Sequence, residues 1–108
     1  MAMSFDTAVK IVVARRKLYD LRAKAPQDQI AKIDSQIQRL DPYKDEANNT
    51  VMAKSDAAFK AAAATLSAQT KDIDAAIADI GKLAQALTQM AAFITGILKV
   101  IQAVGGLP

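Results

Sequence analysis

The stretch "MAAFITGILKVIQAVGG" (residues 90–106) is the most apolar run of the chain, and the rest of the fold has to accommodate it. Its one charged residue is Lys99, and 16 uncharged residues separate Lys99 from the preceding lysine, Lys82. A membrane span needs about 20 predominantly apolar residues, and a lysine near its centre costs about 2.5–3.5 kcal/mol on insertion scales. We therefore expect a helix that is covered by protein and does not span a bilayer.

The polar residues of this C-terminal segment support the same interpretation. At helical spacing they fall on one narrow stripe of the helix surface, and Ala92 fills the single gap in it. The stripe consists of Gln85, Thr88, Thr95, Lys99 and Gln102. The remaining apolar arc is wide, and an amphipathic helix of this kind is typically covered on more than one side.

Upstream of this run the apolar residues continue in a regular heptad pattern. From Phe59 to Ile101 they alternate spacings of four and three residues without a slip. No proline occurs between Pro42 and Pro108. The pattern predicts a long C-terminal helix over residues 42–104, about 95 Å long at about 1.5 Å per residue. As the alternative, the chain turns near residues 67–71 and forms a four-helix bundle.

Two shorter helices are expected before this long one. Ser4 can cap a helix over residues 4–24, which Pro26 ends because proline disfavours the α conformation of the residue before it. A second helix over residues 27–40 has Ile or Leu at heptad spacing, and Asp41–Pro42 signals a new helix start. The predicted fold is all-α: an elongated helical bundle in one domain, residues 1–108, with two short N-terminal helices packed on a long C-terminal helix.

The charge of the chain is unevenly distributed. Residues 1–40 carry eight Lys or Arg against four Asp, whereas residues 41–108 carry six Lys against seven acidic residues. The cations of the first helix line both sides of an apolar seam and do not form one patch, as is typical of residues that flank a helix pair. This arrangement predicts no nucleic-acid partner, although a basic helix beside an apolar one also suits an anionic membrane surface.

The side chains that usually carry chemistry are scarce. The chain has no cysteine and no histidine, and Glu46 is its one glutamate, so thiolate and imidazole chemistry are both ruled out. Asp72 and Asp74 point to nearly opposite sides of a helix, because it turns about 100° per residue, so they cannot share a metal ion. We expect no enzymatic activity, no catalytic, cofactor-binding or metal-binding residues, and no small-molecule substrate.

These observations predict a non-catalytic helical assembly protein that self-associates through its heptad-patterned C-terminal helix, with a second copy or another helical protein as the partner. The predicted interface residues are Leu83, Leu87, Met90, Ile94, Ile97, Leu98 and Ile101. The alternative is a membrane-active protein, a pore-forming or leaderless secreted component, whose C-terminal helix is released onto a bilayer. The first 20 residues lack the charge and apolar pattern of a signal peptide, which predicts a cytoplasmic location with leaderless secretion as the alternative.

Overall fold

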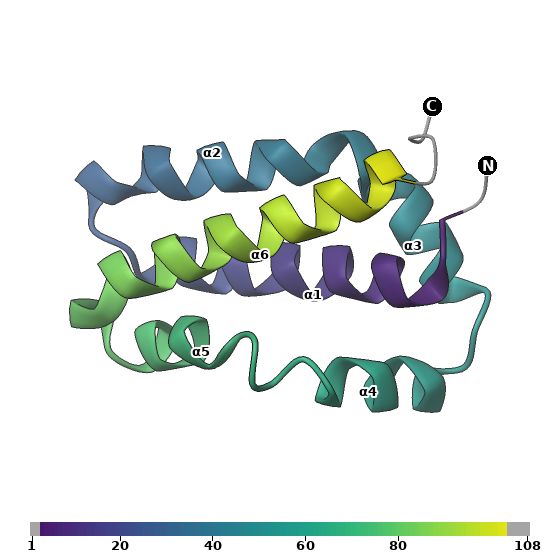
Figure 1. Cartoon of the computed structure of the whole chain (residues 1–108). Coiled ribbons are helices and arrows are strands. Elements are labelled where there is room, and N and C mark those ends of the chain that lie inside the picture. Colours follow the sequence, from purple (N-terminus) through teal and green to yellow (C-terminus); the bar gives the residue numbers. More distant parts are fainter. Residues whose placement is uncertain (1–2, 104–108) are drawn as a thin grey trace.

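The computed structural model describes residues 3–103, and all regular structure within that range is helical (Figure 1). The first helix, α1 (Phe5–Lys24), begins where the Thr7 N–H donates a hydrogen bond of 3.1 Å to Ser4 Oγ. It ends where Ala25 becomes extended ahead of Pro26. The predicted helix over residues 4–24 is therefore confirmed.

The second helix returns alongside α1 after a short 3₁₀ turn, η1 (Gln27–Gln29). Helix α2 (Ile30–Leu40) begins three residues later than the helix predicted over residues 27–40 and ends where predicted, and it buries Ile33, Ile37 and Leu40 of the predicted heptad face. On its outer side Arg22 Nε donates to Asp34 Oδ1 at 2.6 Å. This hydrogen bond and the carboxylate charge raise the pKa of Arg22 above its ordinary value.

The continuous helix predicted over residues 42–104 is wrong. The chain instead forms a series of helices and 3₁₀ turns: η2 (Asp41–Tyr43), α3 (Lys44–Met52), α4 (Asp56–Ala64), α5 (Lys71–Ala78), η3 (Ile80–Lys82) and α6 (Leu83–Ala103). The first break falls before Ser55, which is extended and accepts the Ala58 N–H at 3.1 Å. A serine side chain that caps a new helix thus interrupts the pattern without any proline or glycine.

Two further breaks follow. Between Thr65 and Thr70 the backbone tightens into turns, and the buried Thr70 hydroxyl donates to the Leu66 carbonyl at 3.0 Å. The turn near residues 67–71 that the alternative prediction required is confirmed by this segment, but the four-helix bundle it was to form is wrong, because further breaks give more helices. At Asp79 the backbone is extended and the carboxylate accepts the Gly81 N–H at 3.1 Å, which starts η3. The predicted end at residue 104 lies outside the described residues.

These breaks make the molecule compact, so the expected elongated shape is also wrong. The Cα radius of gyration is 13.7 Å, close to the about 13 Å expected for a compact chain of this length. The principal extents are 39 × 28 × 19 Å. In Figure 1, α1 runs through the middle, with α2 on one side, α4 and α5 on the other, and α6 in front. Short helices can fold back and cover one another, whereas a single 95 Å helix could not be covered by two short ones.

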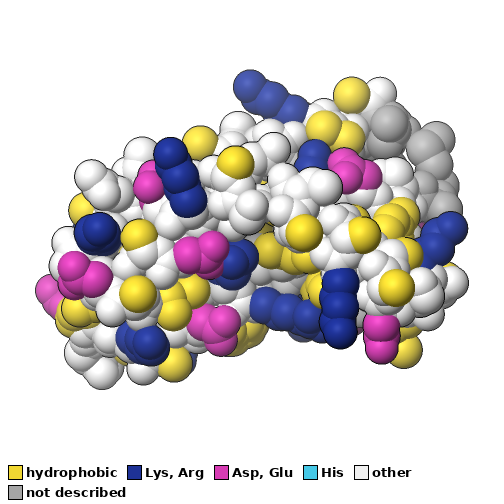
Figure 2. Space-filling model, turned by 90° about the horizontal axis from the view of Figure 1, so that it is seen from below, with side chains coloured by type: hydrophobic (Ala, Val, Ile, Leu, Met, Phe, Trp, Pro, Cys, Tyr) yellow, Lys and Arg dark blue, Asp and Glu magenta, His cyan; other side chains and the backbone are white. Residues whose placement is uncertain are grey.

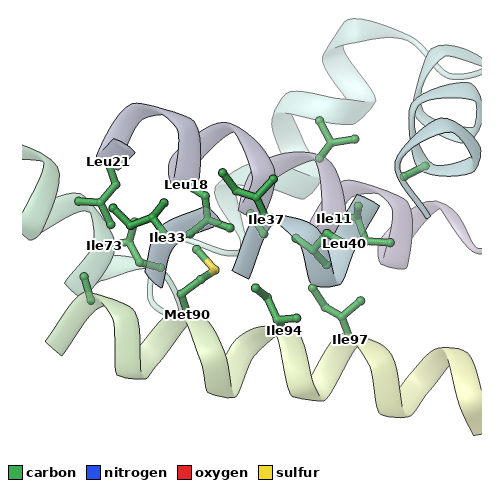
Figure 3. Packing of buried hydrophobic residues seen from close by; sticks show 14 of the residues in the cluster. Ile11, Leu18, Leu21, Ile33, Ile37, Leu40, Ile73, Met90, Ile94 and Ile97 are labelled. Atoms are coloured by element: carbon green, nitrogen blue, oxygen red, sulfur yellow. The ribbon is translucent and has the colours of Figure 1, made fainter. Parts of the chain in front are cut away.

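The core lies where α1, α2, α5 and α6 meet (Figure 3). Its fully buried side chains come from each of these helices and include Leu18, Ile33, Ile73 and Met90. Each buried side chain of this size stabilises the fold by about 1.5–3 kcal/mol through removal of apolar surface from water. Helix α1 also contributes Val9 and Val13 to a second, smaller cluster with Leu66. Because α1 is buried on two sides, it is the central helix of the fold.

Candidate functional site

The C-terminal helix α6 carries the predicted interaction residues, and its inner face belongs to the core. The buried residues follow spacings of three and four along one side of the helix: Leu83, Ala86, Met90, Ile94, Ile97 and Ile101. The heptad spacing predicted instead a seam through Leu87, Ala91, Ile94, Leu98 and Ile101, which places Leu83, Met90 and Ile97 on its flank. The actual core face is rotated towards that flank because α1, α2 and α5 all pack against α6.

The seven predicted interface residues therefore divide into two groups. Five of them are at most 6% exposed and hold α6 in its own chain: Leu83, Met90, Ile94, Ile97 and Ile101. The other two, Leu87 and Leu98, are half-buried. Their role in self-association stays a prediction, and Leu87 and Leu98 are the two members that a second chain can reach in this fold.

The outward face of α6 carries the polar stripe. Gln85, Thr88, Lys99 and Gln102 are exposed, and so is Ala92 between them. At Gly96, next to the stripe, an added Cβ would meet nothing within 4 Å, so this side of the helix opens to solvent. The outward face is thus built of small and uncharged side chains, with Lys99 as the one charged residue of the helix.

Apolar side chains border this stripe on both sides. Leu87, Ala91 and Leu98 lie towards α2, and Val100, which is 47% exposed, lies on the opposite border. Between α2 and α6 two adjoining hollows of about 490 and 460 Å³ share the lining residues Lys32, Leu87 and Thr88. A shallow groove with an apolar floor therefore runs beside the outward face of α6.

Polar contacts fix α6 on both flanks. Arg39 of α2 donates to Thr95 Oγ1 at 2.8 Å and to the Ala91 carbonyl at 3.3 Å. On the other flank Gln89 Oε1 accepts the Asp72 N–H at 3.1 Å, which joins α6 to the start of α5. The sequence analysis did not identify Arg39 as a residue that holds α6. The one sequence signal for this contact was Thr95, a threonine at the edge of a stripe whose other residues face solvent.

Acidic residues gather near the beginning of α6. Asp79 caps η3 immediately before it, and Asp72 lines a hollow together with Gln85 and Thr88. Asp74 forms an ion pair with Lys17 of α1. Lys32, which lines the groove beside Leu87 and Thr88, and Lys82, which directly precedes α6, lie in the same region, so the surface beside the first turns of α6 carries charges of both signs.

The side of the molecule formed by α4 and α5 has a different character. Figure 2, which views the molecule from the side of α4 and α5, shows hydrophobic side chains scattered among charged ones, with Lys and Arg near the middle of the face. Three cations of α1 form ion pairs with acids on other helices or turns: Lys17 with Asp74, Arg22 with Asp34, and Arg15 with Asp41. Much of the positive charge of α1 is therefore used between elements of the same chain.

One helical stretch in the described part of the chain, Ile80–Ala103, is long and apolar enough to cross a membrane by length and composition alone. The mean hydropathy of its most apolar window is 1.4, and 28% of that window is buried inside the chain. Core helices of soluble proteins pass the same test, so this property does not by itself distinguish a membrane partner from a protein partner.

Among residues 3–103 no group of three or more acidic side chains is arranged to hold a metal ion. Comparison with protein-family models, with curated proteins and with solved structures found no match. Any functional argument therefore rests on the surface of the molecule itself.

Proposed function

We propose that this chain is a non-catalytic helical assembly protein whose copies associate through the outward face of α6. The observation that carries the proposal is the low burial of the apolar stretch, since 28% of its most apolar window is buried by its own chain. Protein interfaces are depleted of charged residues at their centre. The outward face of α6 has this composition, because Lys99 is its single charge and Leu87, Leu98 and Val100 border it.

The charges favour an antiparallel pair of α6 helices. Most homo-oligomers are symmetric, and a two-fold axis brings the same surface of two copies together. A parallel pair in register would set Lys99 against the Lys99 of the second copy, which like charges disfavour. An antiparallel pair centred on Ala92 sets Lys99 opposite Gln85, because these residues lie seven positions on either side of the centre. Gln85 shares its hollow with Asp72, so Lys99 gains an acidic neighbour.

Small side chains at the centre suit this arrangement. Helix axes approach to about 8–10 Å, depending on the side chains at the contact. Ala92 and Gly96 are exposed and present little bulk, so a second α6 can approach closely at the crossing point. Association then removes water from apolar side chains on both sides of the crossing, Leu87 and Leu98 on one border and Val100 on the other. This burial supplies the apolar contribution to association.

The proposal is tested by solution mass, measured by light scattering after size exclusion without detergent at several protein concentrations. We expect a dimer or larger species for the wild type and a monomer for Leu87→Asp and Val100→Asp. Met52→Asp is the matched control, because Met52 is 78% exposed on α3 and should leave the mass unchanged. Ile94→Asp is not informative, since Ile94 is fully buried and an unpaired charge there would unfold the chain.

The antiparallel arrangement has its own test. Lys99→Glu should weaken the dimer, and the added change Asp72→Lys should restore it, because the two charges then attract again. A wild type that stays monomeric at every concentration would contradict self-association. A dimer that Lys99→Glu leaves unchanged would contradict the antiparallel arrangement alone.

The second candidate is the membrane-active protein, a pore-forming or leaderless secreted component, and the same low burial of Ile80–Ala103 favours it. Because the buried face of α6 points into the core, this function requires α6 to detach from the core. Met90, Ile94 and the neighbouring residues of α6 are then uncovered. Leakage of anionic liposomes, measured across pH and lipid composition, tests it. Absence of both leakage and vesicle flotation would remove this candidate.

A further inference from the structure

A second surface feature lies between α1 and α3, away from the outward face of α6. It is a hollow of about 330 Å³ whose lining includes Ile11, Arg15, Arg16, Tyr19 and Lys44. Small-molecule sites in proteins usually measure about 300–1,000 Å³, so the hollow is large enough for a small ligand.

The lining is strongly basic. Arg15, Arg16 and Lys44 contribute three positive charges, and Asp20 contributes the one negative charge, so the lining has a net charge of +2. Within residues 3–103 neither Arg16 nor Lys44 takes part in an ion pair. The guanidinium carbon of Arg16 lies over the ring of Phe59, 5.1 Å from its centroid, which is a cation–π contact.

Arg15 has an unmet hydrogen-bonding requirement at this place. Its side chain is 19% exposed, and its Nε is the one buried side-chain nitrogen or oxygen in the described part of the chain without a hydrogen-bond partner. Its Nη2 donates to Asp41 Oδ1 over a long distance of 3.5 Å. Solvent does not reach this Nε, so an oxygen in the hollow can meet its N–H only after the Arg15 side chain shifts, and the cost of an unpaired buried donor favours that shift.

We propose that this hollow binds a small ligand through a phosphate group. A phosphate carries about −1.5 to −2 charges at neutral pH and three strong acceptor oxygens, which match the net charge of the lining and the vacant donor of Arg15. Guanidinium groups bind phosphate through paired N–H donors, and a lysine adds a point charge. Tyr19, which is 50% exposed and lies 5.5 Å from the Arg15 guanidinium, offers an aromatic surface to the organic part of the ligand.

The test follows the Arg15 Nε–H signal by nitrogen-edited NMR while phenyl phosphate or inorganic phosphate is added at constant ionic strength. We expect a saturable shift of this signal, with phenyl phosphate binding more tightly because it can also contact Tyr19. Lys44→Gln should weaken binding by about tenfold, the effect of losing one charge-assisted contact. Lys32→Gln is the control, because it makes the same change on α2, outside the lining of this hollow, and should leave affinity unchanged.

Arg15→Lys separates the role of the vacant donor from that of charge, because lysine keeps the charge and lacks the Nε–H. It should weaken phosphate binding by about tenfold as well. The phosphate could belong to a soluble ester or to a lipid headgroup, and sedimentation with vesicles of phosphatidylcholine and phosphatidic acid distinguishes these sources. If the protein sediments with the vesicles and phenyl phosphate displaces it from them, the phosphate belongs to a lipid headgroup. If the protein binds phenyl phosphate and does not sediment with the vesicles, the phosphate belongs to a soluble ester.

Two results would overturn the proposal. One is an Arg15 Nε–H signal that does not respond saturably to either phosphate probe. The other is an equal loss of affinity in Lys44→Gln and Lys32→Gln, which would show attraction to the whole basic protein and not to this hollow. Neither result depends on whether the chain self-associates.

Discussion

Helices α1 and α4 begin in the same way and are stabilised differently. Each starts after a serine whose side-chain oxygen accepts an N–H from three residues further on, Ser4 for α1 and Ser55 for α4. Helix α1 then buries nine residues and contacts five other α-helices, whereas α4 has no buried residue. The same local signal therefore begins both the central helix of the fold and a helix on its surface.

Their compositions explain how both helices can form. Helix α1 contains Val9, Val12 and Val13, which are weaker helix formers than alanine, so its stability depends on tertiary packing. Helix α4 has the sequence "DAAFKAAAA", which has high intrinsic helix propensity and loses little side-chain entropy. Its main anchor is Phe59, half-buried against the small cluster of Val9, Val13 and Leu66. Packing thus stabilises one helix, and local propensity with a cap stabilises the other.

The largest effect is expected from Leu18→Ala in α1. Leu18 is fully buried, and truncation of a buried leucine to alanine lowers the free energy of unfolding by about 2–5 kcal/mol through lost burial and the cavity left behind. Urea unfolding followed by circular dichroism measures this loss. Leu98→Ala on the half-buried border of α6 is the comparison, and it should cost clearly less. Equal losses would show that α1 is not the centre of the packing.

An intermediate loss of stability is expected when either capping serine is replaced. The loss should appear in a different measurement for each of the two helices. Replacing a capping serine by alanine costs about 0.5–2 kcal/mol. In Ser4→Ala the loss should appear in global unfolding, because α1 contacts all five other α-helices. In Ser55→Ala it should appear as faster amide hydrogen exchange confined to α4, with little change in the urea midpoint. Equal shifts of the midpoint in both variants would show that α4 unfolds together with the core.

The smallest effect is expected from Arg22→Gln. This change removes the ion pair with Asp34 on the exposed side of α1, and exposed pairs contribute little because water and salt screen them. The urea midpoint should stay almost unchanged and become less sensitive to salt. A large loss of stability would mean that ion pairs, and not burial, hold α1 against α2.

How far the fold could be predicted depends on the kind of signal at each position. The end of α1 was predictable because Pro26 acts through sterics that no distant contact can override. The breaks at Ser55 and Asp79 were not, because a serine or aspartate side chain is compatible with both a cap and a helix interior. The heptad pattern could show that α6 has an apolar arc. Because this arc is wide, the pattern does not decide whether Leu87 or Met90 lies in the core. The helices that pack against α6 decide it.

The candidate interface was predictable only in part, for a related reason. Apolar periodicity shows that a side chain will be covered, and it does not show whether its own chain or a partner covers it. Leu83, Ile97 and Ile101 turned out to be covered within the chain, and Leu87 and Leu98 only half so. The hollow between α1 and α3 had no sequence signal at all, since Arg15 and Lys44 are far apart in the chain.

The central place of α1 also has a consequence for how the protein is made. A chain leaves the ribosome at about 5–20 residues per second, and roughly 60 residues separate the end of α1 from the start of α6, so α1 waits for about 3–12 seconds. During that time α2, α3, α4 and α5 can each cover part of α1, and the core surface that α6 covers remains in contact with water or a chaperone. Completion of the native state is therefore a late event in synthesis, and premature termination before α6 would leave an aggregation-prone fragment.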